Sequence, residues 1–233
     1  MDTYIVLVLD ESGSMESIKN DIVKGLNKYI DDLKAQNIPM GFTLNKFNSL
    51  HVSYPYLNTP IAEVQHFTNL DYSPSGNTPL YDAIGNSISE LTEKLEMAKK
   101  YLGNTPPILF ITMTDGMENF SKEHTREGIL SLIKSKEKEG WSFVYLGANQ
   151  DAWAVGGTFG MNVGNTSTYT PDAVGVADAY ALASTATLTH LNTNVQHFKA
   201  TGISQSSTNL LSKNDQPQPP VKKAKKNTAW KKM

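Results

Sequence analysis

Side chains with hydroxyl or carboxylate oxygens occur at three separate places in this 233-residue chain. The first place has the spacing D-x-S-x-S, the second is a threonine in the segment GNTP, and the third is an aspartate in the segment TDG. Together they offer two carboxylates and three hydroxyls, all of them hard oxygen ligands. Magnesium and manganese prefer such ligands, and magnesium commonly uses only one or two carboxylates. The residue types predict a Mg²⁺ or Mn²⁺ site made of Asp10, Ser12, Ser14, Thr78 and Asp115.

Two of these places follow runs that have the composition of buried strands. Residues 4–10 (YIVLVLD) and 107–114 (PILFITMT) are apolar, and an acid stands at or just after the end of each run. The third place ends a long polar connection, residues 58–78, before a helix that we expect to begin near Pro79. Ligands of an open parallel sheet bind beyond the carboxyl ends of its strands, so we expect the three places to meet at one edge.

Hydrophobic periodicity predicts that strands and helices alternate along the rest of the chain. Apolar residues three and four positions apart predict helices, and the segments 40–47 and 50–57 predict a hairpin in which Pro55 marks an edge strand. The further expected elements are helices 15–36, 79–102, 123–139, 150–155 and 171–189, and strands 141–147 and 160–163. This order predicts an α/β fold, doubly wound, with a mostly parallel central sheet and one antiparallel edge strand.

Charge divides the chain into an acidic body and a basic end. Residues 213–233 contain seven lysines and one aspartate, a net charge of +6, while the other 212 residues contain 14 basic and 22 acidic side chains, a net charge of −8. We expect one domain over residues 1–198 and a disordered Pro- and Lys-rich tail over 199–233, because the tail cannot bury enough apolar surface to order itself. Contact with a polyanion is predicted for the tail lysines Lys222, Lys223, Lys225, Lys226, Lys231 and Lys232.

Composition excludes several classes of protein. There is no cysteine, which excludes disulfide scaffolds, thiolate metal sites and cysteine nucleophiles. The first residues lack the pattern of a signal peptide and no run is long enough to span a membrane, so we expect a cytoplasmic protein. Phosphate-binding loops and the G-x-S-x-G motif are absent, and the single arginine, Arg126, disfavours a body that reads nucleic acid.

The three motifs together resemble the von Willebrand factor A-type (VWA) domain with its metal-ion-dependent adhesion site. The resemblance extends over about residues 3–198 in element order, and the segments SGNTPLYDAIG, TDGMEN and YLGAN look most like cytoplasmic single-domain VWA proteins of bacteria and phages, with a looser similarity to those associated with tellurite resistance. It implies a Rossmann-like fold. It also implies that Ser12, Ser14 and Thr78 bind the metal through hydroxyls, and that Asp10 and Asp115 bind it directly or through water.

The resemblance further implies a protein-interaction module whose metal accepts an Asp or Glu side chain of a partner protein. Asp82 and Asn77 are then candidates for supporting the ligands. From its place in the sequence, Glu11 is expected to be solvated but close enough to the site to tune it. Two alternatives stay open from the residues alone. One is a metal-dependent enzyme acting on a phosphate-containing small molecule, although no general base is apparent. The other is association with nucleic acid or another polyanion through the lysine-rich tail.

Overall fold

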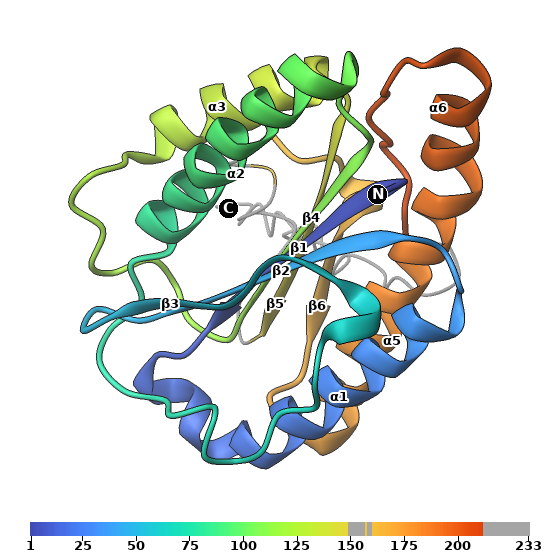
Figure 1. Ribbon diagram of the computed structural model, residues 1–233. Coiled ribbons are helices and arrows are strands. Elements are labelled where there is room, and N and C mark those ends of the chain that lie inside the picture. Colours follow the sequence, from blue (N-terminus) through green and yellow to red (C-terminus); the bar gives the residue numbers. More distant parts are fainter. Residues whose placement is uncertain (149–156, 158–159, 212–233) are drawn as a thin grey trace, which may run out of the picture.

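The computed structural model describes residues 1–148, 157 and 160–211 (Figure 1). The expected helix at 150–155 and the tail lysines lie outside these residues. Six strands form one sheet in the order β3-β2-β1-β4-β5-β6. Every pairing is parallel except that of β2 with β3, which is antiparallel at one edge. The strands are β1 (Thr3–Asp10), β2 (Met40–Phe47), β3 (Val52–Pro60), β4 (Ile108–Thr114), β5 (Trp141–Ala148) and β6 (Thr166–Tyr169).

Helices cover both faces of the sheet, which makes the architecture three-layered (Figure 1). One face carries α1 (Lys19–Ala35) and α5 (Ala173–His190), and the other carries α2 (Leu80–Leu102) and α3 (Arg126–Lys138). A π-helical turn, Leu191–Val195, joins α5 to the short α6 (Gln196–Thr201). The sheet therefore has the doubly wound, mostly parallel form with an antiparallel edge that the sequence predicts.

Strand β1 lies at the centre of the core because both of its faces are apolar. Ile5, Leu7 and Leu9 pack with α1 and α5, while the alternate residues of the strand pack with α2 and α3. All eight residues of β1 are buried, as are all seven of β4, so the two strands whose ends carry the predicted ligands are held rigidly side by side. Burial of large aliphatic side chains on this scale is the dominant stabilising term.

The last strand is displaced from its expected position. Residues 160–163 were predicted as a strand, but β6 spans Thr166–Tyr169 and pairs with Tyr145–Ala148 of β5. A 3₁₀ turn, Val163–Asn165, precedes it, and the Asn165 side chain bonds the carbonyl of Ser207 (2.7 Å) and the amide of Leu210 (2.8 Å). These long-range contacts set where the strand starts. The apolar content of residues 160–163 therefore does not predict the position of the strand.

Residues that pack against the domain also occur beyond the predicted boundary at residue 198. Helix α6 runs to Thr201, and Leu210 and Leu211 are fully buried. Two leucines in an otherwise polar segment are enough to dock it when they fill a gap in the core. None of the helices in the described ranges is both long enough and apolar enough to cross a membrane.

Candidate metal centre

The carboxyl ends of β1 and β4 bring the first and third predicted places together. The two strands are parallel neighbours, with Leu9 opposite Met113. Asp10 ends β1, and Asp115 directly follows the end of β4. Pairing in register therefore places two carboxylates, which lie far apart in the sequence, on the same edge of the sheet.

Hydrogen bonds join five residues with oxygen-bearing side chains at this edge. The Ser14 hydroxyl donates to Asp115 Oδ1 at 2.6 Å and lies 3.1 Å from the Ser12 hydroxyl. The amide of Ser12 donates to Asp10 Oδ1 (2.7 Å), and the Thr114 hydroxyl donates to Asp10 Oδ2 (2.5 Å). Ser12 and both aspartates are buried, whereas Ser14 is exposed. The cluster is thus buried at Ser12 and the two aspartates and open to solvent at Ser14.

Gly116 shows that Thr78 joins the same cluster. A Cβ atom built on Gly116 would lie 2.9 Å from Thr78 Oγ1, and 3.7 Å from both Asp10 Oδ2 and Ser14 Oγ. Because Gly116 has no side chain, the space between these three oxygens is free of protein carbon. The structure therefore brings all five predicted residues to one small volume, although they come from three loops.

The loop after β4 is tied to the start of α2, which fixes Thr78. The Thr78 amide donates to Asn119 Oδ1 (2.9 Å), and the Asn119 amide donates to the Thr78 carbonyl (3.2 Å). Asp82, a predicted supporting residue, accepts hydrogen bonds from the amides of Lys122, Glu123 and His124. Asp82 therefore orders the loop that follows Asp115 and does not itself face the cluster. Asn77, the other predicted supporting residue, bonds Ser49 through its main chain.

Burial makes the two carboxyl groups of the cluster poor acids. Desolvation raises the pKa of Asp10 to about 6, although hydrogen bonds from Thr114 and Ser12 oppose the shift, and the charge of Asp115 adds to it. Desolvation also raises the pKa of Asp115, with the Ser14 hydrogen bond opposing. Two anions that lie close together with little water are stabilised by a cation, so this electrostatic arrangement favours binding a positive ion.

Glu11 is predicted to be solvated, but the structure shows that it is buried. Its carboxylate accepts from Lys46 Nζ (2.9 Å) and the Ser73 amide (2.6 Å), and lies 3.2 Å from His51 Nε2. Lys46 also donates to the Asp71 carbonyl. A lysine inside an apolar strand was the one sequence signal for this cluster, since such a charge needs a buried partner.

Two tyrosines lie beneath the cluster, and neither was predicted from the sequence. The Tyr72 hydroxyl donates to the carbonyl of Asp10, and the Tyr169 hydroxyl donates to the carbonyl of Thr114 at 3.3 Å. Burial raises the pKa of both phenols well above the ordinary value, so both stay protonated donors. They donate to the carbonyl oxygens at the ends of β1 and β4 and so tie the two strand ends to the residues beneath them.

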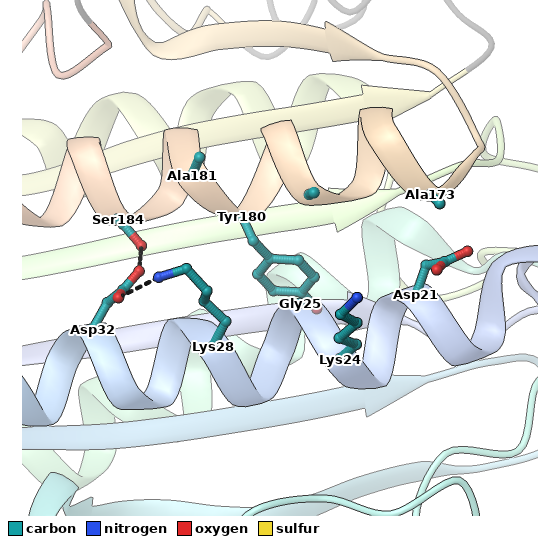
Figure 2. A pocket seen from close by; sticks show the side chains of 10 residues that line it. Asp21, Lys24, Gly25, Lys28, Asp32, Ala173, Tyr180, Ala181 and Ser184 are labelled. Carbon is teal, nitrogen blue, oxygen red and sulfur yellow. Dashed lines mark hydrogen bonds and ion pairs between the residues drawn. The ribbon is translucent and has the colours of Figure 1, made fainter.

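A separate apolar groove of about 300 Å³ lies between α1 and α5 (Figure 2). The ring of Tyr180 passes over Gly25, where an added Cβ would lie 2.2 Å from the ring. At one end, Asp32 accepts from Lys28 Nζ and Ser184 Oγ, both at 2.8 Å. None of the five predicted ligands lines this groove, so it is distinct from the cluster.

Comparison with solved structures identifies the fold. The chain resembles proximal thread matrix protein 1 (PTMP1) from the mussel byssus, solved with a zinc-occupied MIDAS motif (TM-score 0.51, 17% identity, 78% of this chain and 46% of that one). It also resembles the SpRpn10 VWA domain (0.52, 9%, 76% and 93%) and manganese-loaded Plasmodium vivax TRAP protein (0.50, 16%, 76% and 71%). The chain spans about half the length of the PTMP1 structures.

Sequence comparison adds nothing to this result, because no family profile and no curated protein matches the chain. The identification of the fold therefore stands on structure, because the likeness to those neighbours extends over more than three quarters of this chain. The chain therefore has the fold of a VWA domain.

Proposed function

We propose that this protein is a metal-dependent protein-interaction module. In this proposal Asp10, Ser12, Ser14, Thr78 and Asp115 hold one Mg²⁺ or Mn²⁺ ion, and the exposed side of the ion accepts a carboxylate from a partner protein. The observation that carries the proposal is the space at Gly116, around which the oxygens of Thr78, Asp10 and Ser14 converge. Two of the structural neighbours are described as metal-loaded, one with zinc and one with manganese.

The donor set fits a hard divalent cation. The five residues offer only oxygen, as Mg²⁺ and Mn²⁺ prefer. The described part of the chain contains no cluster of three or more His, Cys, Asp or Glu side chains placed for a metal, and the three hydroxyls complete the set here. Hydroxyls are neutral ligands and leave the charge of the ion only partly offset, most of all where a carboxylate binds through water, so the ion would still attract an incoming carboxylate.

When bound, the ion would supply a site of positive charge that recognises an incoming carboxylate. The chain's own residues prepare this site. Asp10 and Ser12 are held by buried hydrogen bonds, and Ser14 lies at the exposed side, where a partner has access. A partner with Asp or Glu at its contact point is therefore favoured over one with Asn or Gln, because a charged oxygen gains more from the ion than a neutral one.

The proposal is tested in two stages with the full chain. Calorimetric titration with Mn²⁺ and Mg²⁺ should show one site in the wild type and none in Asp10→Asn combined with Ser12→Ala. A peptide array that pairs each Asp- or Glu-containing peptide with its Asn or Gln counterpart should then show binding to the acidic member alone. That binding should disappear in EDTA.

The matched control is Asp178→Asn, which removes an exposed carboxylate from α5 and should change neither result. Absence of a Mn²⁺ or Mg²⁺ site in the wild type would overturn the metal part of the proposal. Peptide binding that survives EDTA would overturn the part that concerns the partner carboxylate.

The uneven charge supports a second role for the lysine-rich end. A segment with a net charge of +6 attached to a body at −8 favours contact with a polyanion. Filter binding to a random DNA duplex should weaken steeply between low and high salt, and deletion of residues 213–233 should abolish it. Equal binding by the deleted chain would contradict this role.

A further inference from the structure

The loop that carries Thr78 runs beside the loop that carries Ser12 and Ser14. The Ser75 amide donates to the carbonyl of Glu11 (2.9 Å), and the Gly13 amide donates to the carbonyl of Gly76 (3.0 Å). A third bond uses a side chain, since the Ser73 amide donates to the Glu11 carboxylate at 2.6 Å. Residues 73–76 are therefore bound to residues 11–13 through three hydrogen bonds, two of which end on Glu11.

The Glu11 carboxylate is held on its other side by the edge hairpin. Lys46 on β2 forms an ion pair with it at 2.9 Å, and the two side chains are only 10% and 1% exposed. His51, in the turn after β2, lies 3.2 Å from its second oxygen. A buried carboxylate without such partners would be strongly disfavoured, so the lysine and the serine amide fix where this group can lie.

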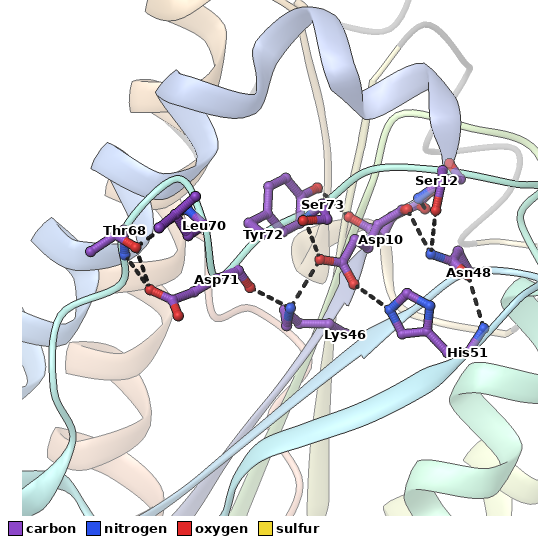
Figure 3. Close-up of polar contacts among 12 residues, drawn as sticks. Asp10, Ser12, Lys46, Asn48, His51, Thr68, Leu70, Asp71, Tyr72 and Ser73 are labelled. Atoms are coloured by element: carbon purple, nitrogen blue, oxygen red, sulfur yellow. Dashed lines mark hydrogen bonds and ion pairs between the residues drawn. The ribbon is translucent and has the colours of Figure 1, made fainter.

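The Glu11 carboxylate contacts Lys46, Ser73 and His51. Figure 3 shows these three labelled residues gathered at one place. Glu11 influences the centre indirectly, through residues 73–76. Thr78 follows Gly76 by only two residues. A shift of residues 73–76 would change the distance from the Thr78 hydroxyl to the Asp10 and Ser14 oxygens, which converge at Gly116.

We propose that Glu11 is a positioning residue for the metal centre: its buried carboxylate, held by Lys46, fixes residues 73–76 and thereby the Thr78 hydroxyl. The inference rests on the proposed metal site. Residues that orient metal ligands commonly change metal affinity about 10- to 100-fold when they are altered. The same scale is expected here, without any loss of a direct ligand.

The experiment is a double-mutant cycle on the full chain, with the Mn²⁺ dissociation constant as the readout. Glu11→Gln should weaken binding about tenfold, and Thr78→Ala should weaken it as well. The double variant should bind about as weakly as the weaker single variant, because Glu11 acts through Thr78. Lys46→Met should reproduce the loss, and Lys46→Arg, which keeps the charge, should retain most of the affinity.

The matched control is Lys136→Met. Lys136 is also 10% exposed and pairs with Glu139 at 2.9 Å, at the end of α3. This substitution should leave the Mn²⁺ dissociation constant unchanged, which separates loss of a buried lysine in general from loss of Lys46; the partner Glu139 is itself 51% exposed. Each dissociation constant is measured at a temperature below the unfolding transition of the variant, so that the chain is folded.

Hydrogen exchange of the wild type supplies a measurement that needs no variant. The amides of Ser73 and Ser75 should be protected, since each donates to Glu11. Rapid exchange of both amides would overturn the inference. A Glu11→Gln chain with wild-type Mn²⁺ affinity would also overturn it. So would a double variant in which the losses of affinity from Glu11→Gln and Thr78→Ala multiply. If the wild type binds no metal, the proposed function is overturned and the inference with it. If the wild type binds metal and Glu11→Gln binds equally well, only the inference is overturned.

Discussion

The Ser14 hydroxyl donates a 2.6 Å hydrogen bond to Asp115 Oδ1, across 101 residues of sequence. This bond joins the loop after β1 to the loop after β4 and uses a carboxylate whose pKa is raised by burial. In the absence of a cation, the serine proton is thus the group that stabilises Asp115. A bound cation would compete for both oxygens. Metal binding would therefore compete with the hydrogen bond between Ser14 and Asp115.

Gly116→Ala should impair metal binding selectively. The new methyl group would lie 2.9 Å from Thr78 Oγ1, inside the space that the ligands surround. We expect Mn²⁺ affinity to fall at least tenfold while the chain remains folded, as measured by calorimetry and circular dichroism. Gly128→Ala is the matched control, because its methyl group would meet only Thr125, at 3.3 Å. Equal Mn²⁺ affinity in the two variants would contradict the assignment.

Metal affinity should decrease as the pH falls below about 6. The pKa of Asp10 is about 6, and a metal ligand must lose its proton before it binds. Each pH unit below that value should therefore weaken binding by about tenfold, and by more where Asp115 also takes up a proton. Calorimetric titrations with Mn²⁺ from pH 7.5 to 5 check this. A dissociation constant that does not change across this range would rule out Asp10 as a ligand.

Asp10→Asn should stabilise the metal-free protein at pH 7. The pKa of Asp10 is raised from 3.8 to about 6 on folding, so its ionisation destabilises the folded state, fully above pH 6 and not at all below 3.8. A shift of about two units corresponds to about 3 kcal/mol, which is the upper limit of the expected gain in the free energy of unfolding. Urea denaturation in EDTA measures it. A loss of stability at pH 7 would show that hydrogen bonds from Ser12 and Thr114 outweigh desolvation.

His190 should make the fold sensitive to acid. Burial lowers the pKa of its imidazole from 6.5 to about 3, because the ring is enclosed and bonds only Thr3 through Nε2 (3.0 Å). The unfolded chain takes up a proton below pH 6.5 and the folded chain does not, so stability falls by about 1.4 kcal/mol per pH unit from 6.5 toward 3. Replacement by glutamine should flatten this dependence. Parallel urea denaturation curves of the two proteins at pH 7 and 5 compare the slopes, and identical slopes would contradict the prediction.

The same pattern in the sequence predicts both the central strands and the site. No pattern in the sequence predicts the contacts that support the site. Residues 4–10 and 107–114 are apolar on both faces, which indicates central parallel strands, and their ends define the site edge. The position of Glu11 depends on Lys46 and Ser73, 35 and 62 residues away, and no local pattern encodes that pairing. The same holds for β6 and for Leu210, whose places are set by Asn165.

Both ends of the described chain lie on the edge of the sheet opposite the cluster. Thr3 begins β1, and the Leu211 amide bonds the carbonyl of Gly164, just before β6 begins. All strands except β3 run from this edge toward the ligand loops, so the molecule has two poles (Figure 1). Met1, two residues before β1, is 45% exposed, so a label attached there would sit at the pole remote from Ser14. Immobilisation through Met1 would therefore present the five ligand residues outward, free to meet another molecule.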